Sequence, residues 1–251
     1  MLEIWKTTIP QLSGGATRRV YVWLPASYRQ RPAQRYPVLY MFDGHNVFFD
    51  SHATYGKSWG MGDYLRATDK ELIVVAVECN HAGHTRLSEY SPVDFEAGPL
   101  GTIEGRGRAY MDWLTGELKP LVDARYRTLP DREHTAICGS SMGGLMALYG
   151  ATVYNHLFRR AACLSPSLWA DPAAILSLVE GAALGADTCI YMDYGSRELP
   201  CHPATVGALG DMTRLLLERG VHVTCRVVPG GEHCEATWER QIPIFMACLG
   251  L

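Results

Sequence analysis

The stretch Thr135-Ala136-Ile137-Cys138-Gly139-Ser140-Ser141-Met142-Gly143-Gly144 decides the fold. A short apolar run leads into the pattern Gly-x-Ser-x-Gly, and a helical pattern follows it. This order predicts a sharp strand-to-helix turn at Ser141, with glycines where no bulkier side chain would fit. Such a turn directs the backbone N–H of Met142 and the positive end of the helix toward any group bound to the serine. Because Gly-x-Ser-x-Gly alone has low specificity, the rest of the chain must supply the partners of Ser141.

Apolar runs of strand length alternate with helical patterns along the chain. This alternation predicts an α/β fold, with a mostly parallel central sheet covered by helices on both faces, as a single domain over residues 1–251. Pro120 should kink or shorten the first long helix. The predicted strands are 18–24, 36–42, 72–77, the run before Ser141, 160–164, 188–193 and 221–228, and the predicted helices are 104–124, 142–154, 204–219 and 235–249.

Two segments rich in Gly, His, Tyr and Ser, 46–65 and 80–107, are expected to be long loops. In a domain of this kind such loops usually form the pocket.

The composition narrows the class of partner. The net charge is −3 and no basic tract is present, so nucleic acid is not an expected partner. No apolar run is long enough to cross a bilayer, and the first residues do not resemble a signal peptide. The eight cysteines are scattered without a Cys-x-x-Cys motif, which favours a reducing, cytoplasmic compartment. The sequence leaves open whether the chain forms a homo-oligomer.

The cysteines fall into two groups. Four lie in apolar, strand-like runs and are expected to be buried small hydrophobic side chains: Cys138, Cys163, Cys189 and Cys225. Two others, Cys201 and Cys234, lie close in sequence to candidate catalytic residues. A disulfide between them stays open, because sequence does not establish the geometry that a disulfide needs.

A serine hydroxyl becomes a nucleophile only beside a base that is itself held by an acid. In an open parallel sheet, these groups come from loops at the carboxyl ends of strands. His233 lies in the turn after the last predicted strand and is the best base of the nine histidines. The rivals His45, His81 and His84 all precede the acid candidates in the chain, whereas the order Ser, acid, His is expected of this fold.

The acid follows the strand that ends near residues 193–195. Glu198 lies in the loop after Gly195, whereas Asp193 is expected to lie still within the strand. We favour Glu198 and keep Asp193 as the alternative. The second oxyanion donor is expected from the loop after the strand ending at Phe42, at the backbone N–H of His45. His81 and His84 suggest a metal pair, but further ligands at matching spacing are missing, so neither a metal nor another cofactor is expected.

Together these motifs resemble the esterase D-like family of α/β-hydrolases. The family includes S-formylglutathione hydrolases, feruloyl and acetyl-xylan esterases, enterochelin esterases and mycolyltransferases. The resemblance runs from Arg19 to the last helix, and implies that Glu198 is the acid and His45 an oxyanion donor. The residues that carry it are 40–46 (YMFDGHN), 86–92 (RLSEYSP), 117–123 (ELKPLVD), 126–128 (YRT), 139–144 (GSSMGG) and 231–233 (GEH).

The predicted function is that of a serine carboxylesterase acting through an acyl-enzyme on Ser141. Its expected substrates are small-molecule or carbohydrate-linked esters of acetyl or hydroxycinnamoyl type. Trp59, Tyr90 and Trp169 are expected in pocket loops, where they would stack on an aromatic acyl group or a sugar. The alternatives are a thioesterase of S-formylglutathione hydrolase type, an acyltransferase, and a catalytically inactive binding protein with this fold.

Overall fold

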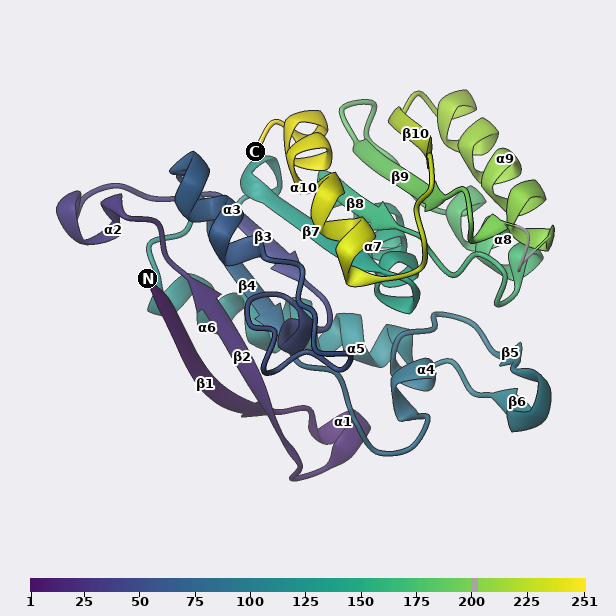
Figure 1. The fold of residues 1–251 in the computed structure, drawn as a ribbon, viewed down its shortest axis with the longest axis horizontal. Coiled ribbons are helices and arrows are strands. Elements are labelled where there is room, and N and C mark those ends of the chain that lie inside the picture. The colour runs from purple at the N-terminus through teal and green to yellow at the C-terminus, as the bar shows by residue number, and fades with distance from the viewer. Residues whose placement is uncertain (200–202) are drawn as a thin grey trace.

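A central sheet of eight strands, in the order β1-β2-β4-β3-β7-β8-β9-β10, runs through the molecule (Figure 1). The computed structural model describes residues 1–199 and 203–251. The strands are β1 Leu2–Thr8, β2 Thr17–Trp23, β3 Val38–Met41, β4 Ile73–Val77, β5 Phe95–Glu96, β6 Thr102–Ile103, β7 Thr135–Ser140, β8 Arg160–Leu164, β9 Cys189–Gly195 and β10 His222–Val228. The α-helices are α1 Pro10–Ser13, α2 Ser27–Gln30, α3 Met61–Thr68, α4 Thr85–Glu89, α5 Gly107–Trp113, α6 Lys119–Arg125, α7 Met142–Val153, α8 Pro172–Glu180, α9 Pro203–Glu218 and α10 Glu235–Leu249.

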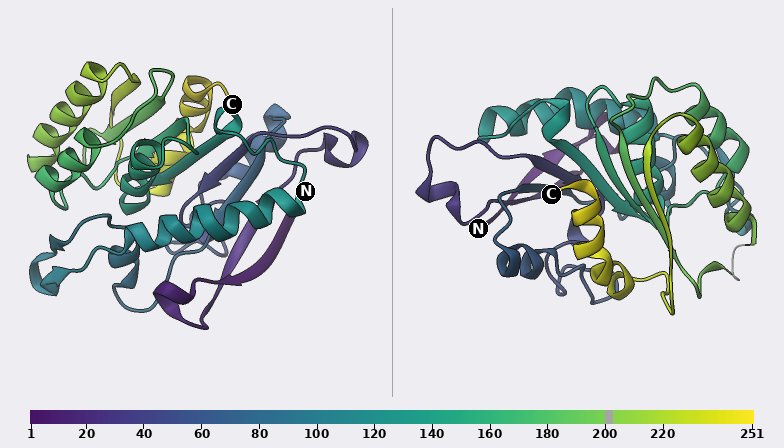
Figure 2. Two further views of the ribbon diagram at one scale, coloured as in Figure 1. Left: turned by 180° about the vertical axis from the view of Figure 1, so that it is seen from behind. Right: turned by 90° about the horizontal axis from the view of Figure 1, so that it is seen from above.

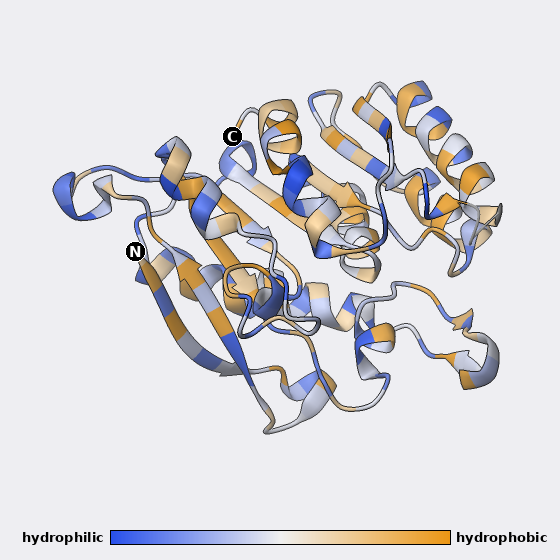
Figure 3. Ribbon diagram, viewed as in Figure 1, coloured by the Kyte–Doolittle hydropathy of each residue, from blue (hydrophilic) through white to orange (hydrophobic). Residues whose placement is uncertain are grey.

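Strands β4, β3, β7, β8, β9 and β10 are parallel, so their carboxyl ends share one edge of the sheet. Strands β1 and β2 are added antiparallel at the other side of β4. The central strands read as nearly continuous apolar runs because helices cover both of their faces. In Figure 3, orange is frequent along the strands at the centre, and blue appears mainly on turns and helices.

The sheet separates two layers of helices (Figure 2, right). Alternation along β3 sends Val38 and Tyr40 into one layer of the core and Leu39 and Met41 into the other. Helices α3 and α10 pack on the Leu39 side, and helices α5 to α9 pack on the opposite side. The prediction of an α/β architecture with a mostly parallel sheet and helices on both faces is therefore confirmed.

The structure adds elements to the segments predicted as loops. The segment 46–65 runs into helix α3, and 80–107 contains α4 and the small β5–β6 hairpin. Strand β1 was also missed, because its half-exposed residues carry only a weak apolar signal. The predicted helix 104–124 is interrupted by a π-helical turn at Leu114–Leu118, and Pro120 lies in the first turn of α6, where a missing N–H is tolerated.

The cysteine predictions are confirmed in part. Cys138 and Cys163 are buried, but Cys189 is only partly buried and Cys225 is exposed, because β10 is the edge strand of the sheet. Cys201 lies outside the described residues, so the question of its pairing with Cys234 lies there too. Among the described residues, no helix is both long and apolar enough to cross a membrane.

Candidate active site

Ser141 occupies the tight turn between β7 and α7. Its backbone has φ 58° and ψ −126°, a conformation that a residue with a side chain rarely adopts. The glycines around it are required sterically, since a Cβ on Gly139 would lie 2.4 Å from the carbonyl oxygen of Gly143. The N–H of Met142, the first residue of α7, has no acceptor within the helix, as at every helix start. The local geometry is therefore that of the predicted nucleophile turn.

His233 and Glu198 form a close pair at the carboxyl edge of the sheet. Nδ1 of His233 lies 2.6 Å from Oε2 of Glu198. Burial by itself would raise the pKa of Glu198, but hydrogen bonds from His233, the Gly195 N–H and Ser165 outweigh burial and lower the pKa. The carboxylate is thus ionised at neutral pH, and it orients the ring so that Nε2 is the free nitrogen.

Ser165 and Trp238 complete this network, and neither residue was predicted from the sequence to belong to the site. The Ser165 hydroxyl donates to Oε1 of Glu198 at 2.8 Å and accepts a hydrogen bond from the Trp238 indole at 3.0 Å. Trp238 also places its ring edge-on against His233, with the ring centroids 5.1 Å apart. The signal for Ser165 was its place directly after β8, between the strands that lead to Ser141 and to Glu198.

Asp193, the alternative acid, faces elsewhere. It lies within β9, and its carboxylate accepts a hydrogen bond from Tyr191 at 2.6 Å. Burial raises the pKa of Asp193 to about 6. Residues 191 and 193 share one face of the strand because side chains alternate along it, whereas Glu198 is carried beyond the strand end and back toward His233. The geometry therefore favours Glu198 of the two carboxylates.

The loop after β3 carries His45 beside the serine turn. Asp43 starts this loop with φ 54°, and Gly44 approaches β4 so closely that a Cβ would lie 2.5 Å from the carbonyl oxygen of Ala76. Arg86 holds Asp43 in a bidentate ion pair, at 2.7 and 2.6 Å. In the 3₁₀ turn that follows, the first backbone hydrogen bond runs from the N–H of Asn46 to the carbonyl oxygen of Asp43. The N–H of His45 comes one residue earlier, so this turn does not use it.

Ser141 and His233 are the two residues that line both cavities at this edge. One cavity, of about 320 Å³, extends from them toward Trp169 and Tyr194. The other, of about 380 Å³, extends toward His45 and the loop after β4. A molecule with a reactive bond at Ser141 would therefore have room on each side of that bond.

The family model described as "Putative esterase" matches residues 13–246. The chain belongs to this esterase family. Esterase Rv1288 of Mycobacterium tuberculosis is 30% identical over 201 residues, which cover 73% of this chain and 39% of that protein. Apo-salmochelin esterase of Escherichia coli O6:H1 is 26% identical over 173 residues, which cover 65% of this chain and 51% of that protein.

Solved structures support the same architecture. A ferulic acid esterase matches with a TM-score of 0.71 at 19% identity, over 100% of this chain and 97% of that one. The α/β-hydrolase fold predicted from the sequence is thereby confirmed, and the match to the family model confirms the predicted family resemblance. The chain spans only 39% and 51% of the two curated relatives named above.

Two of the three aromatic residues predicted to contact substrate lie in the core instead. Trp59 is buried between Trp238 and Phe245, and Tyr90 is fully buried beside Phe42. Neither lines a cavity that contains Ser141. The prediction was wrong for both residues, because an aromatic side chain in a Gly-rich segment can turn inward to fill the core. Trp169 does line the 320 Å³ cavity.

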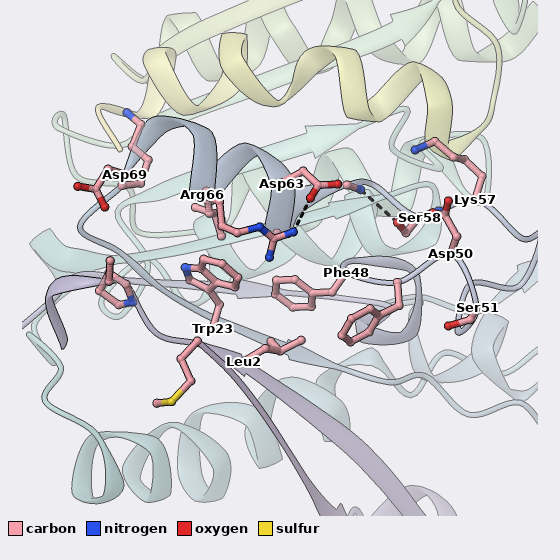
Figure 4. A pocket seen from close by; sticks show the side chains of 18 residues that line it. Leu2, Trp23, Phe48, Asp50, Ser51, Lys57, Ser58, Asp63, Arg66 and Asp69 are labelled. Carbon is pink, nitrogen blue, oxygen red and sulfur yellow. Dashed lines mark hydrogen bonds and ion pairs between the residues drawn. The ribbon is translucent and has the colours of Figure 1, made fainter. Parts of the chain in front are cut away.

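A larger cavity, of about 730 Å³, lies away from these residues, between the start of β1, the end of β2 and helix α3 (Figure 4). Trp23 and Phe48 stack within it, and Arg66 pairs with Asp63. None of the described residues that line this cavity is a histidine or a cysteine. It therefore offers no histidine to activate a serine, and the candidate site is the smaller pair of cavities at Ser141.

One group near the site could hold a metal ion. His45, Cys79 and His81 offer ligand atoms that lie within 4.8 Å of one another. Sequence spacing suggested only the pair His81 and His84, because His45 is far away from both in the chain.

Proposed function

We propose that this chain is a serine hydrolase of carboxylic esters. Ser141 is the nucleophile, His233 the general base and then acid, and Glu198 the group that orients His233. The observation that carries the proposal is the 2.6 Å contact between His233 and Glu198 beside a serine held at positive φ. Each of these residues follows a different parallel strand, which is where this fold supplies the three functions.

In the proposed reaction, Oγ of Ser141 attacks the ester carbonyl carbon while its proton passes to Nε2 of His233. Nδ1–H of His233 remains donated to Glu198, whose negative charge stabilises the imidazolium. The N–H groups of Met142 and His45 stabilise the oxyanion. Collapse expels the alcohol, which takes the proton from His233, and water then hydrolyses the acyl-enzyme by the same steps.

Our proposed substrates are small-molecule or carbohydrate-linked esters of acetyl or hydroxycinnamoyl type. Supporting this, Trp169 and Tyr194 line one of the two cavities that meet at Ser141, where an aromatic or sugar ring would have a flat surface to stack on. The similarity to proteins described as a ferulic acid esterase and an apo-salmochelin esterase is consistent with small-molecule ester substrates. A reducing, cytoplasmic setting remains part of the proposal.

Two other activities use the same residues. A thioesterase of S-formylglutathione hydrolase type would cleave a thioester faster than the matched oxygen ester. An acyltransferase would divide its product between acid and a new ester when an alcohol or sugar is added. Parallel rates on matched substrates, with and without an acceptor, separate both from the esterase.

The direct test is Ser141→Ala. The variant should lose hydrolysis of p-nitrophenyl acetate, by roughly a million-fold when a catalytic serine is removed, and it should no longer be labelled by a fluorophosphonate. Ser167→Ala is a matched control, since Ser167 is buried nearby but lines neither cavity. Retained turnover or labelling in Ser141→Ala would refute the assignment. An unlabelled wild-type protein would instead favour an inactive binding protein.

A further inference from the structure

Three side chains with nitrogen or sulfur donors converge on one wall of the 380 Å³ cavity. His45 follows β3, and Cys79 and His81 follow the adjacent parallel strand β4. Their ligand atoms lie within 4.8 Å of one another, and all three residues line the cavity. The rings of His45 and His81 meet edge to face, with centroids 4.6 Å apart.

The hydrogen bonds of the two imidazoles leave the same nitrogen free in each. Nε2 of His45 lies 3.0 Å from the Thr54 hydroxyl, and Nε2 of His81 lies 3.1 Å from a carboxylate oxygen of Glu78. Donation from Nε2 leaves a lone pair on Nδ1. His45 is only 2% exposed, and among the described residues its Nδ1 has no hydrogen-bond partner. A buried nitrogen without a partner is rare and needs an explanation.

The pattern is that of a metal ligand with its supporting partner. Metal-binding histidines commonly donate the second ring N–H to an oxygen, which fixes the ring and the tautomer. Here Glu78 and Thr54 occupy those supporting positions. Two imidazoles and one thiol are a donor set for zinc and related transition ions, and not for calcium or magnesium, which prefer oxygen.

The distances are close to those that zinc needs. Bond lengths of about 2.0 Å to nitrogen and 2.3 Å to sulfur place tetrahedral donors roughly 3.5 Å apart. The three ligand atoms all lie within 4.8 Å of one another, so no pair of them has to approach by more than about 1.3 Å. The side chain of His81 is 53% exposed and can rotate to close this gap. Three protein ligands leave a fourth position for water, as in zinc sites that remain open to solvent.

We propose that His45, Cys79 and His81 form a binding site for one zinc-class divalent ion on the wall of the Ser141 cavity. On binding, the Cys79 thiol releases its proton to solvent and coordinates as thiolate. The neighbouring charges on this wall are paired, Asp43 with Arg86 and Glu78 with Arg19. The ion can therefore bind without displacing Arg86 or Arg19 from its carboxylate partner. The site stands whether or not Ser141 is a nucleophile.

The test uses Co²⁺ as a spectroscopic probe on the full chain after removal of metals with a chelator. Wild-type protein should bind one Co²⁺ per chain and develop a thiolate-to-cobalt charge-transfer band, which Zn²⁺ then displaces. Cys79→Ser should abolish this band. His81→Gln, at a side chain that is 53% exposed, should weaken Co²⁺ binding by about ten-fold or more.

Cys225→Ser and His84→Gln are the matched controls, since both residues are exposed and lie outside the group. They should bind Co²⁺ like the wild type. Absence of a saturable band at one equivalent would overturn the proposal, as would a band that persists in Cys79→Ser or that depends on Cys225. Binding that is unchanged in a folded His81→Gln variant would overturn the assignment of His81.

Discussion

Replacing Glu198 by glutamine is expected to lower kcat by about 10³- to 10⁴-fold, and the structure gives the reason. Oε1 of Glu198 accepts two hydrogen bonds, from the Gly195 N–H at 2.7 Å and from the Ser165 hydroxyl at 2.8 Å. A glutamine must keep its oxygen at this position, because the alternative places its NH₂ group against the N–H of Gly195. That alternative leaves buried donors without acceptors, at a cost of about 1–3 kcal/mol.

The glutamine NH₂ group therefore faces His233. Nδ1 of His233 must then accept a hydrogen bond, and the ring proton moves to Nε2, where it blocks the uptake of the serine proton. At about 1.36 kcal/mol per ten-fold change, the expected loss corresponds to about 4–5.5 kcal/mol of transition-state stabilisation. KM should change little, because Glu198 reaches the substrate only through His233.

The assay is kcat and KM for p-nitrophenyl acetate, with thermal unfolding to establish that the variant is folded. Asp193→Asn is the matched control: it changes the alternative carboxylate, keeps an acceptor for the Tyr191 hydroxyl, and should stay within a few-fold of wild type. If a folded Glu198→Gln variant retains more than a tenth of wild-type kcat, or if Asp193→Asn loses as much, the reasoning from hydrogen-bond polarity is wrong.

Three further outcomes follow from the structure. Gly139→Ala should destabilise the protein by about 1–3 kcal/mol in urea unfolding, because its methyl group meets the backbone of Gly143; an unchanged midpoint would contradict the steric argument. Burial raises the pKa of Asp193 in the folded protein from 3.8 to about 6, so the folded state binds more protons and stability falls as the pH rises through this range. Asp193→Asn should flatten this part of the plot of unfolding free energy against pH. A plot parallel to that of the wild type would contradict the prediction. Trp59→Ala should lower the free energy of unfolding by about 3–5 kcal/mol, because Trp59 lies in the core. Trp169→Ala should mainly alter KM with little change in the unfolding midpoint, because Trp169 lines the cavity at Ser141. The reverse pattern would contradict the assignment of Trp59 to the core and Trp169 to the cavity.

The sequence was most informative where local chemistry is restrictive. The apolar runs predicted five of the six parallel strands of the sheet, because a strand covered on both faces needs a nearly continuous apolar sequence. The sixth, the edge strand β10, was predicted from its alternating pattern instead. The pattern around Ser141 predicted the turn, since few residues other than glycine fit at Gly139. Strand β1 was not predicted because one of its faces is open to solvent. Helix α3 was not predicted because its short helical pattern follows a Gly-rich segment.

The candidate site was predicted in part. Chain order after the strands pointed to Ser141, Glu198 and His233, whereas Ser165 and Trp238 were missed, since a serine and a tryptophan have many roles. The aromatic residues were the weakest predictions: a Gly-rich segment indicates a loop but not the direction of its side chains, and both Trp59 and Tyr90 turned inward.

By itself, the sequence determined the alternation of strands and helices and the glycines that let the chain turn at Ser141. These are short-range properties of neighbouring residues, and they are written in residue type and spacing. Tertiary structure alone decided that Glu198 rather than Asp193 faces His233, and that His45 meets Cys79 and His81. Those contacts join residues from separate loops, and their distances are set by the register and packing of the parallel strands that carry the loops to one edge.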